Sequence, residues 1–192
     1  MTKVLKNNKI FSFILVLALV LGTSVTAFAD TITPVQPTYP MTVTVQFEAE
    51  EETVTDMDDV DHNIPAIDVT KYVTYASAGA FNTEFPIDSG ATHELEGYPT
   101  VMDAIYNAYH QYSPSMTRFS MGWDTYSSPN GVYITNLFGI GTITQDATSN
   151  SWLGHSWSIY LNNDLINLYA SNVQIESGDV VKVVYQENQE NW

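Results

Sequence analysis

The sequence predicts an α+β domain in which one helix covers one face of a β-sheet. Two observations support this prediction. Several short segments alternate apolar and polar residues with a period of two, which is typical of half-buried strands. Only residues 100–112 repeat with the period of an amphipathic helix. Because strands and helices do not alternate along the chain, a parallel α/β sheet is not expected.

The first 29 residues read as an export signal. A basic start with Lys3, Lys6 and Lys9 precedes an apolar run from Ile10 to Leu21 and the small-residue site Ala27-Phe28-Ala29. The apolar run is shorter than the ~20 residues of a spanning helix, so cleavage is expected, with an uncleaved anchor as the alternative. Residues 30–40 contain three prolines and no periodicity, and we interpret them as a linker.

The domain is expected to begin with a strand at residues 41–47, which alternate cleanly. An acidic run follows at residues 48–61. Residues 67–76 are rich in β-branched and aromatic side chains and predict a second strand. Residues 81–97, rich in Gly, Pro, Ser and Asp, are expected to form a loop.

The helix prediction rests on one apolar stripe and on its N-terminal cap. The stripe consists of Val101, Ala104, Ile105, Ala108, Tyr109 and Tyr112. Thr100 and Asp103 have the spacing of a capping box. Pro114 ends the helix, and His110 lies on its polar face. The stripe should therefore pack on the sheet.

Further strands follow the helix. Residues 111–130 are interpreted as a loop with room for a short strand. Residues 131–140 return to strand character, with one face formed by Val132, Ile134 and Phe138 and the other by Tyr133, Thr135 and Leu137. The clearest alternation is at residues 156–161, where Trp157, Ile159 and Leu161 oppose Ser156, Ser158 and Tyr160.

Two turn signals organise the C-terminal part. Asn162-Asn163-Asp164 tolerates the left-handed backbone of a tight turn directly after the strand at 156–161. Ser177-Gly178-Asp179 is the second turn signal and precedes a terminal strand. One face of that strand is expected to carry Val181, Val183 and Tyr185.

Composition limits the possible partners. The 192-residue chain has six basic and 22 acidic residues, a net charge of −16. Cleavage after Ala29 leaves three basic residues against 22 acidic ones, a net charge of −19. Such a chain is repelled by nucleic acid and by anionic lipid, so we expect no nucleic-acid partner and no membrane insertion after signal cleavage. The chain has no cysteine, so disulfides are excluded. A secreted, acidic, globular protein is predicted.

The acidic run offers a candidate metal site. Four carboxylates lie at the close spacing that calcium favours: Asp56, Asp58, Asp59 and Asp61. The run is not an EF-hand loop, because Asp61 stands where glycine is needed and Ile67 where glutamate is needed. A solvated loop that keeps the protein soluble is the alternative interpretation.

No catalytic motif is evident. The chain lacks a Gly-x-Ser-x-Gly nucleophile motif, a cysteine and a glycine-rich phosphate loop. No two histidines have zinc-ligand spacing; they are His62, His93, His110 and His155. A non-enzymatic protein is therefore expected.

Aromatic side chains are the remaining candidates for binding. Trp157 lies on the inward register of its strand and is most simply a core residue. Tyr133 and Tyr160 lie on the opposite faces of their strands and are expected to be exposed, where aromatic rings bind flat ligands or sugars.

The motifs from the helix to the C-terminus resemble a known family. They are Thr100-Val101-Met102-Asp103-Ala104-Ile105, then residues 131–140 (GVYITNLFGI), then Ser156-Trp157-Ser158-Ile159-Tyr160-Leu161-Asn162, then residues 178–185 (GDVVKVVY). Their order and spacing resemble the DUF4430 family, which is similar to the C-terminal β-domain of transcobalamin and intrinsic factor. With the first strand, the resemblance spans residues 41–187 and leaves residues 188–192 as a C-terminal tail.

The resemblance implies a β-grasp-like fold on a secreted or surface protein of a Gram-positive bacterium. In the vertebrate carriers this domain closes over one side of cobalamin. Carried over to this chain, the ligand-facing residues are Tyr133, Thr135, Asn136, Phe138 and Trp157. Two features depart from the family: the chain has no room for the carriers' helical domain, and Asn162-Asn163 replaces the usual Asn-Gly turn.

Two functions are therefore expected from the sequence. The leading one is a secreted or surface-attached, non-enzymatic module that binds a corrinoid such as cobalamin, or another flat ligand. The alternative is a structural or adhesive surface module that binds a protein or glycan partner and is stiffened by calcium at residues 48–61.

Overall fold

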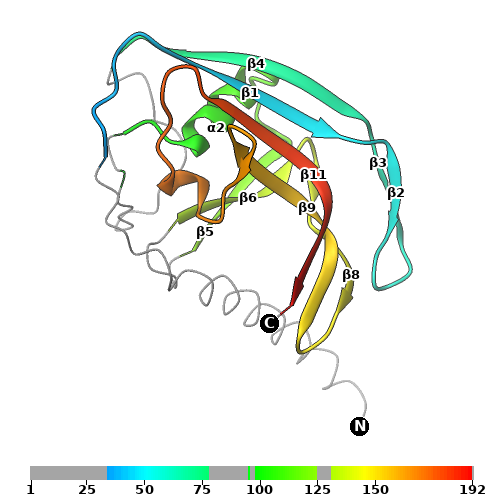
Figure 1. Ribbon diagram of the computed structural model, residues 1–192. Coiled ribbons are helices and arrows are strands. Elements are labelled where there is room, and N and C mark those ends of the chain that lie inside the picture. Colours follow the sequence, from blue (N-terminus) through cyan, green and yellow to red (C-terminus); the bar gives the residue numbers. More distant parts are fainter. Residues whose placement is uncertain (1–33, 78–94, 96–97, 125–130, 192) are drawn as a thin grey trace.

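The structure, a computed structural model, describes residues 34–77, 95, 98–124 and 131–191 (Figure 1). Its elements are β1 (Met41–Ala49), β2 (Glu52–Thr55), β3 (Asp61–Ile64), β4 (Ile67–Tyr75), α2 (Val101–Tyr112), β5 (Phe119–Asp124), β6 (Gly131–Leu137), β7 (Ile140–Gly141), β8 (Ile143–Ala147), β9 (Ser151–Leu161), β10 (Asp164–Leu165), the 3₁₀ helix η2 (Ala170–Asn172) and β11 (Val180–Asn191). One α-helix among the strands of these described residues confirms the predicted α+β class.

The expected signal peptide at residues 1–29 lies outside the described residues, as does nearly all of the expected loop at 81–97. Residues 34–40, the described part of the expected linker, contain no helix or strand. In the part of the chain that the structure describes, no helix is both long and apolar enough to cross a membrane.

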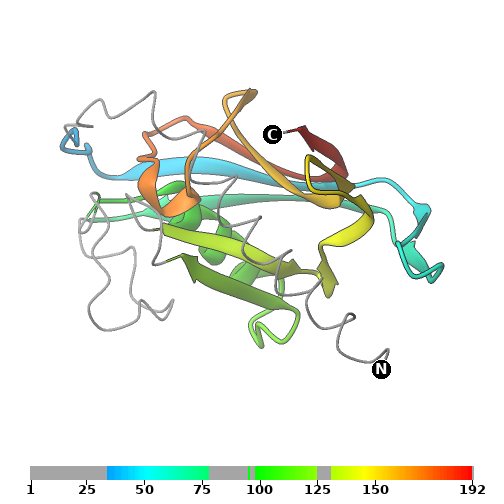
Figure 2. The ribbon, with the colours of Figure 1, turned by 90° about the horizontal axis from the view of Figure 1, so that it is seen from below.

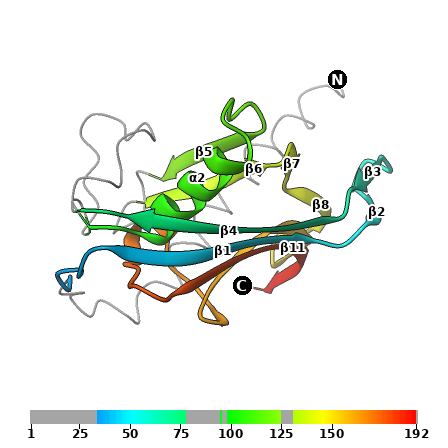
Figure 3. The same cartoon turned by 90° about the horizontal axis from the view of Figure 1, so that it is seen from above.

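A six-stranded sheet forms the centre of the domain. Its strand order is β10-β9-β11-β1-β4, and β8 also pairs with β9. The first and last of the described strands, β1 and β11, are parallel neighbours, whereas β1–β4 and β9–β11 are antiparallel. Figure 3 shows β1, β4 and β11 running side by side. The inward side chains of β1 are fully buried: Met41, Val43, Val45 and Phe47.

Helix α2 packs on the inner face of this sheet, as predicted. Ile105 and Ala108 are completely buried and belong to one core cluster with β1 and β11. At the N-terminus, the Thr100 hydroxyl accepts the Asp103 backbone N–H at 3.3 Å, and the Asp103 carboxylate accepts the Thr100 backbone N–H at 2.8 Å. The predicted capping box is thus confirmed. His110 is exposed.

A three-stranded sheet, β5-β6-β7, lies beneath the long strands, and Figure 2 shows β5 and β6 in the foreground. The residue pairing between β5 and β6 shifts at Ser120/Met121, so that Thr135 has no direct partner on β5. This β-bulge reverses the alternation, since an extra residue changes which side chains face the core. Leu137 is therefore buried, although it was expected on the outward face of its strand. The expectation that Phe138 lies in the same strand, on the other face from Leu137, was also wrong, because Phe138 lies in a turn with φ of 57°.

The C-terminal strands are longer than predicted. β9 begins at Ser151, and β11 continues to Asn191, so residues 188–191 form part of a strand and the expected C-terminal tail was wrong. The reason is that β9 and β11 pair along their whole length, from Val181↔Leu161 to Asn191↔Ser151. Both predicted turns are confirmed: Asn162 and Asn163 have φ of 53° and 72°, and Gly178 has φ of 96°.

The acidic run is the largest difference from the sequence prediction. Instead of a loop, residues 52–64 form the hairpin β2–β3, which projects from one end of the sheet (Figure 1). The pair Glu52↔Ile64 sets its register, and the hairpin buries Val54 and Ile64 against the core cluster. Strand β8 was also not predicted; it pairs with the first half of β9.

Candidate functional site

Tyr133 is the best placed of the predicted ligand-facing residues. Its side chain is 42% exposed, as the alternation predicted. It stands opposite Gly122 of β5. A Cβ atom at Gly122 would lie 2.3 Å from the Tyr133 ring, so the ring lies directly over this glycine. Because glycine has no side chain, the ring can rest on the backbone of the neighbouring strand, which holds it in one orientation.

A second ring stands beside Tyr133. The ring centroids of Tyr133 and Tyr169 are 6.4 Å apart, with 42° between the ring planes. Tyr169 directly precedes η2 and packs on Gly131, where an added Cβ would lie 2.2 Å from the Tyr169 side chain. The Ser171 hydroxyl accepts the Val132 backbone N–H at 2.9 Å and joins η2 to β6. Two tight contacts therefore position Tyr169.

Hydroxyl groups lie further along the same strands. The hydroxyl oxygens of Ser120 and Thr135 are 2.8 Å apart, and both side chains are exposed. We call Tyr133, Tyr169, Ser120 and Thr135 the Tyr133 platform. Asn136, the next residue of β6, is half-buried beside Gly141. The platform thus combines two aromatic rings with a pair of hydroxyl groups.

Phe138 and Trp157 lie in the core, away from the exposed side of β6. The Phe138 ring contacts an aromatic cluster, with centroid distances of 5.4 Å to Phe47, 5.1 Å to Tyr109 and 6.2 Å to Trp157. Trp157 is half-buried, and its indole N–H donates to the Ile140 carbonyl at 2.9 Å. The structure therefore gives both side chains a packing role.

Tyr160 lies neither on the Tyr133 platform nor in the core. It lies on the outer face of the six-stranded sheet, opposite the face that α2 covers, and its hydroxyl accepts a hydrogen bond from Gln186 at 3.0 Å. The six predicted ligand residues are consequently divided: Tyr133, Thr135 and Asn136 lie on β6, Phe138 and Trp157 in the core, and Tyr160 on the outer face.

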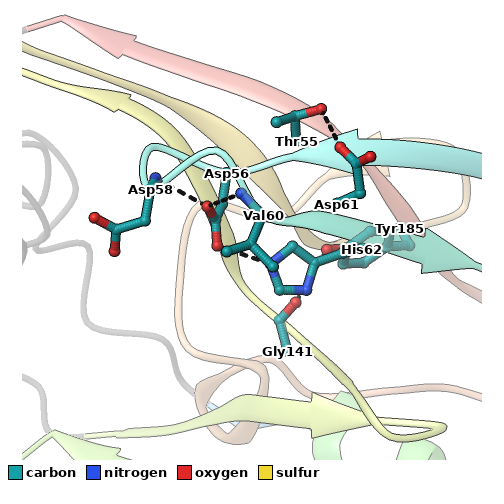
Figure 4. A network of polar contacts seen from close by, with 8 residues as sticks. All are labelled: Thr55, Asp56, Asp58, Val60, Asp61, His62, Gly141 and Tyr185. Carbon is teal, nitrogen blue, oxygen red and sulfur yellow. Dashed lines mark hydrogen bonds and ion pairs between the residues drawn. The ribbon is translucent and has the colours of Figure 1, made fainter.

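The four candidate metal ligands lie in and around the β2–β3 turn, and Figure 4 shows three of them, Asp56, Asp58 and Asp61. Asp56 accepts the backbone N–H groups of Asp58 and Val60 at 2.9 and 3.0 Å and the His62 Nε2–H at 2.8 Å. Asp61 accepts the Thr55 hydroxyl at 2.8 Å. The hydrogen bond from His62, followed by that from Val60, lowers the pKa of the Asp56 carboxyl below its ordinary value.

These carboxylates are not gathered around a common point. Figure 4 shows the Asp58 carboxylate directed away from that of Asp56. Throughout the described ranges, no three His, Asp or Glu side chains are grouped so that they could hold a metal ion. Calcium binding by Asp56, Asp58, Asp59 and Asp61 would therefore require the turn to rearrange.

Polar contacts that the sequence did not reveal attach this hairpin to the sheet. His155 is buried; its Nε2 lies 3.4 Å from the Glu52 carboxylate and its Nδ1 3.1 Å from the Gln145 side-chain oxygen. The Met57 backbone N–H donates to the Thr144 carbonyl at 2.9 Å. His155 and Glu52 are distant in the sequence and carry no recognisable spacing, so no pattern could have indicated this pair.

Comparisons with known proteins leave the family open. No family model matches the chain, and no curated protein matches it. A candidate metal-binding protein from Ruminococcus gnavus ATCC 29149 is similar in structure, with 11% identity and a TM-score of 0.36, over 77% of this chain and 98% of that one. Haptocorrin in complex with Cbi matches with 9% identity and a TM-score of 0.38, over 79% of this chain and 27% of that one. The resemblance to DUF4430 stays a prediction.

Proposed function

We propose that this protein is a non-enzymatic binding module that holds a flat, polar-rimmed ligand on the Tyr133 platform. The observation that carries the proposal is the exposed Tyr133 ring, which rests on Gly122 beside Tyr169. Aromatic rings bind flat molecules through their faces, and polar groups at the edge fix the orientation. Ser120 and Thr135 supply such groups.

The platform is organised before any ligand arrives. The backbone under Tyr133 and the contacts of Tyr169 with Gly131 restrict both rings. A ligand that stacks on them therefore loses little free energy to the ordering of side chains. The net charge of −16 disfavours an anionic ligand. A neutral or cationic flat ligand fits these conditions, and the sequence resemblance at residues 131–140 favours a corrinoid.

The same resemblance, which spans residues 41–187, leads us to infer a β-grasp-like domain, and β11 extends this domain to Asn191. The strand arrangement supports this inference. β1 and β11 are parallel neighbours at the centre, β4 pairs with the outer side of β1, and α2 follows β4 in the sequence. We also infer export and cleavage after Ala29, which mass spectrometry of the exported protein would test by finding Asp30 at the N-terminus.

Titration with cobinamide and cobalamin tests the proposed ligand. Intrinsic fluorescence, corrected for absorption by the corrinoid, should change saturably in the wild type. Tyr133→Ala and Tyr169→Ala should each weaken binding by about tenfold or more, the loss of about 1–3 kcal/mol typical of an aromatic contact. Tyr72→Ala is the matched control, because Tyr72 is a 68% exposed tyrosine on β4, away from the platform.

Each outcome has a distinct meaning. Unchanged affinity in both platform variants would place the ligand elsewhere. Absence of saturable binding in the wild type up to about 100 μM corrinoid, a free energy weaker than about −5.5 kcal/mol, would contradict the corrinoid assignment and favour the adhesive module.

A further inference from the structure

The outer face of β9 and β11 carries a connected group of uncharged polar side chains. We call it the outer patch, and its members are Ser156, Ser158, Tyr160, Gln186 and Asn188. The two strands are antiparallel neighbours, with Ser156 directly opposite Gln186. The opposite face of the same strands carries Trp157 and Tyr185, which pack in the core. The outer patch is therefore separate from the Tyr133 platform.

Two side-chain amides fix the geometry of the outer patch. The Gln186 amide N–H₂ lies within donating distance of the Ser158 hydroxyl at 3.1 Å and of the Tyr160 hydroxyl at 3.0 Å. The Asn188 amide N–H₂ donates to the Ser156 hydroxyl at 2.9 Å, and its carbonyl accepts the Ser158 hydroxyl at 3.1 Å.

Burial distinguishes this group from an ordinary solvated sheet surface. Ser158 is only 9% exposed although it points to the outer side of the sheet, because the two amides cover it. Gln186, Asn188 and Tyr160 are half-buried. Long polar side chains on an open strand surface usually keep their rotamer freedom, and binding through them costs free energy for each side chain that is immobilised. In the outer patch the internal hydrogen bonds already restrict them.

The hydrogen bonds leave specific groups available. Within the described residues, the Gln186 side-chain oxygen has no hydrogen-bond donor, and the hydroxyl hydrogens of Tyr160 and Ser156 have no acceptor. One acceptor and two donors therefore remain on a surface that includes part of an aromatic ring. Val184, half-buried between these positions on β11, adds an apolar contact.

Charges border the outer patch without entering it. Lys182 of β11 is paired directly with Tyr160 of β9. Its ammonium group forms an ion pair with the Glu48 carboxylate at 2.7 Å. Its charge is thereby neutralised at that end. The five side chains of the outer patch are themselves uncharged. With a net charge of −16 on the chain, an anionic polymer would be repelled from this face.

We propose that the outer patch is a second binding site, specific for a neutral oligosaccharide. A sugar offers hydroxyl groups that both donate and accept, together with an apolar C–H face. The patch matches these with two free donors and one free acceptor beside the Tyr160 ring and Val184. The patch residues follow one another along two paired strands, which suits an extended chain of several sugar units. This proposal is independent of the Tyr133 platform, because the two lie on different sheets.

Isothermal titration with three neutral hexasaccharides, cellohexaose, mannohexaose and chitohexaose, tests the proposal, with a galacturonate hexamer as the anionic comparison. At least one neutral hexasaccharide should bind saturably at millimolar concentration. Tyr160→Ala and Gln186→Ala should each weaken binding by about tenfold. Tyr160→Phe keeps the ring and removes the hydroxyl donor, and should cause a smaller loss. Far-UV circular dichroism of each variant checks folding.

Thr74→Ala is the matched control. Thr74 also lies on the outer face, at the other edge of the sheet, and is hydrogen-bonded only to Thr42, at 3.0 Å, among the described residues. Its replacement should leave affinity unchanged. The proposal is wrong if no neutral hexasaccharide binds, if the galacturonate hexamer binds as well as the neutral sugars, or if folded Tyr160→Phe and Gln186→Ala bind like the wild type.

Discussion

Replacement of Trp157 distinguishes a packing role from a ligand-binding role. Resemblance to the cobalamin carriers placed this side chain at the ligand surface, whereas strand alternation placed it in the core. In the structure its ring lies 5.1 Å from the Tyr185 ring and 6.2 Å from the Phe138 ring, measured between centroids. Its indole N–H donates to the Ile140 carbonyl at 2.9 Å. We therefore expect Trp157→Ala to destabilise the protein, and any loss of binding to follow from unfolding.

The magnitude follows from these contacts. Truncation of a packed tryptophan to alanine costs about 3–5 kcal/mol, and because Trp157 is half-buried we expect about 3 kcal/mol. Trp157→Phe keeps most of the ring contact but removes the N–H donor. Ile140 is only 8% exposed, so its carbonyl would lose a partner that water replaces poorly. For this variant a loss of about 1–2 kcal/mol is expected.

Equilibrium unfolding in urea, followed by far-UV circular dichroism, measures both free energies without relying on tryptophan fluorescence. Tyr72→Ala serves as the control: its side chain is 68% exposed, and its replacement should change stability by no more than about 0.5 kcal/mol. The reasoning fails if folded Trp157→Ala loses less than about 1 kcal/mol of stability while its corrinoid affinity falls tenfold. That result would place the ring at the ligand.

Three further predictions concern the helix and the hairpin. Ile105→Ala should cost about 2–5 kcal/mol in urea unfolding, because Ile105 is fully buried, whereas His110→Ala on the exposed side should cost less than about 0.5 kcal/mol; equal losses would contradict the helix register. Asp56 has a lowered pKa, so its carboxylate stabilises the folded hairpin above the ordinary aspartate pKa of about 3.9, and this contribution is lost as pH falls through the lower folded value. Asp56→Asn should accordingly lower the melting temperature at pH 7 but not at the acidic end of the folded range, and a difference independent of pH would contradict this assignment. Calcium and sodium at matched ionic strength should raise the melting temperature equally, because the hairpin carboxylates are not grouped; a calcium-specific gain that Asp56→Asn with Asp58→Asn removes would establish a site.

Local chemistry made several elements predictable. Two local signals specify α2, and they lie within a few residues of one another in the sequence. One is the capping box of Thr100 and Asp103, and the other is the apolar stripe that follows it. The Asn162-Asn163 turn depends on the tolerance of asparagine for positive φ, which is a property of the residue itself. Alternation likewise predicted that Tyr133 is exposed, because this requires only that Val132 faces the core.

Tertiary structure decided what depends on distant partners. The hairpin β2–β3 was hidden because its many acids suggested a loop, yet it forms where Val54 and Ile64 can be buried together. The burial of Leu137 followed from a bulge at Thr135, and a bulge is a property of two paired strands that neither sequence alone reveals.

In the candidate sites, too, the sequence predicted local features and the tertiary structure decided which residues came together. Sequence alternation put Tyr133 and Tyr160 on outward faces and made both of them candidates for ligand binding. The structure places them on different sheets, because alternation determines the side of a strand but not which strands become neighbours. Tyr169 and Gln186 attracted no notice in the sequence. They gained their roles only when η2 packed on β6 and β11 paired with β9, since hydrogen bonds and ring contacts between distant segments exist only once the chain has folded.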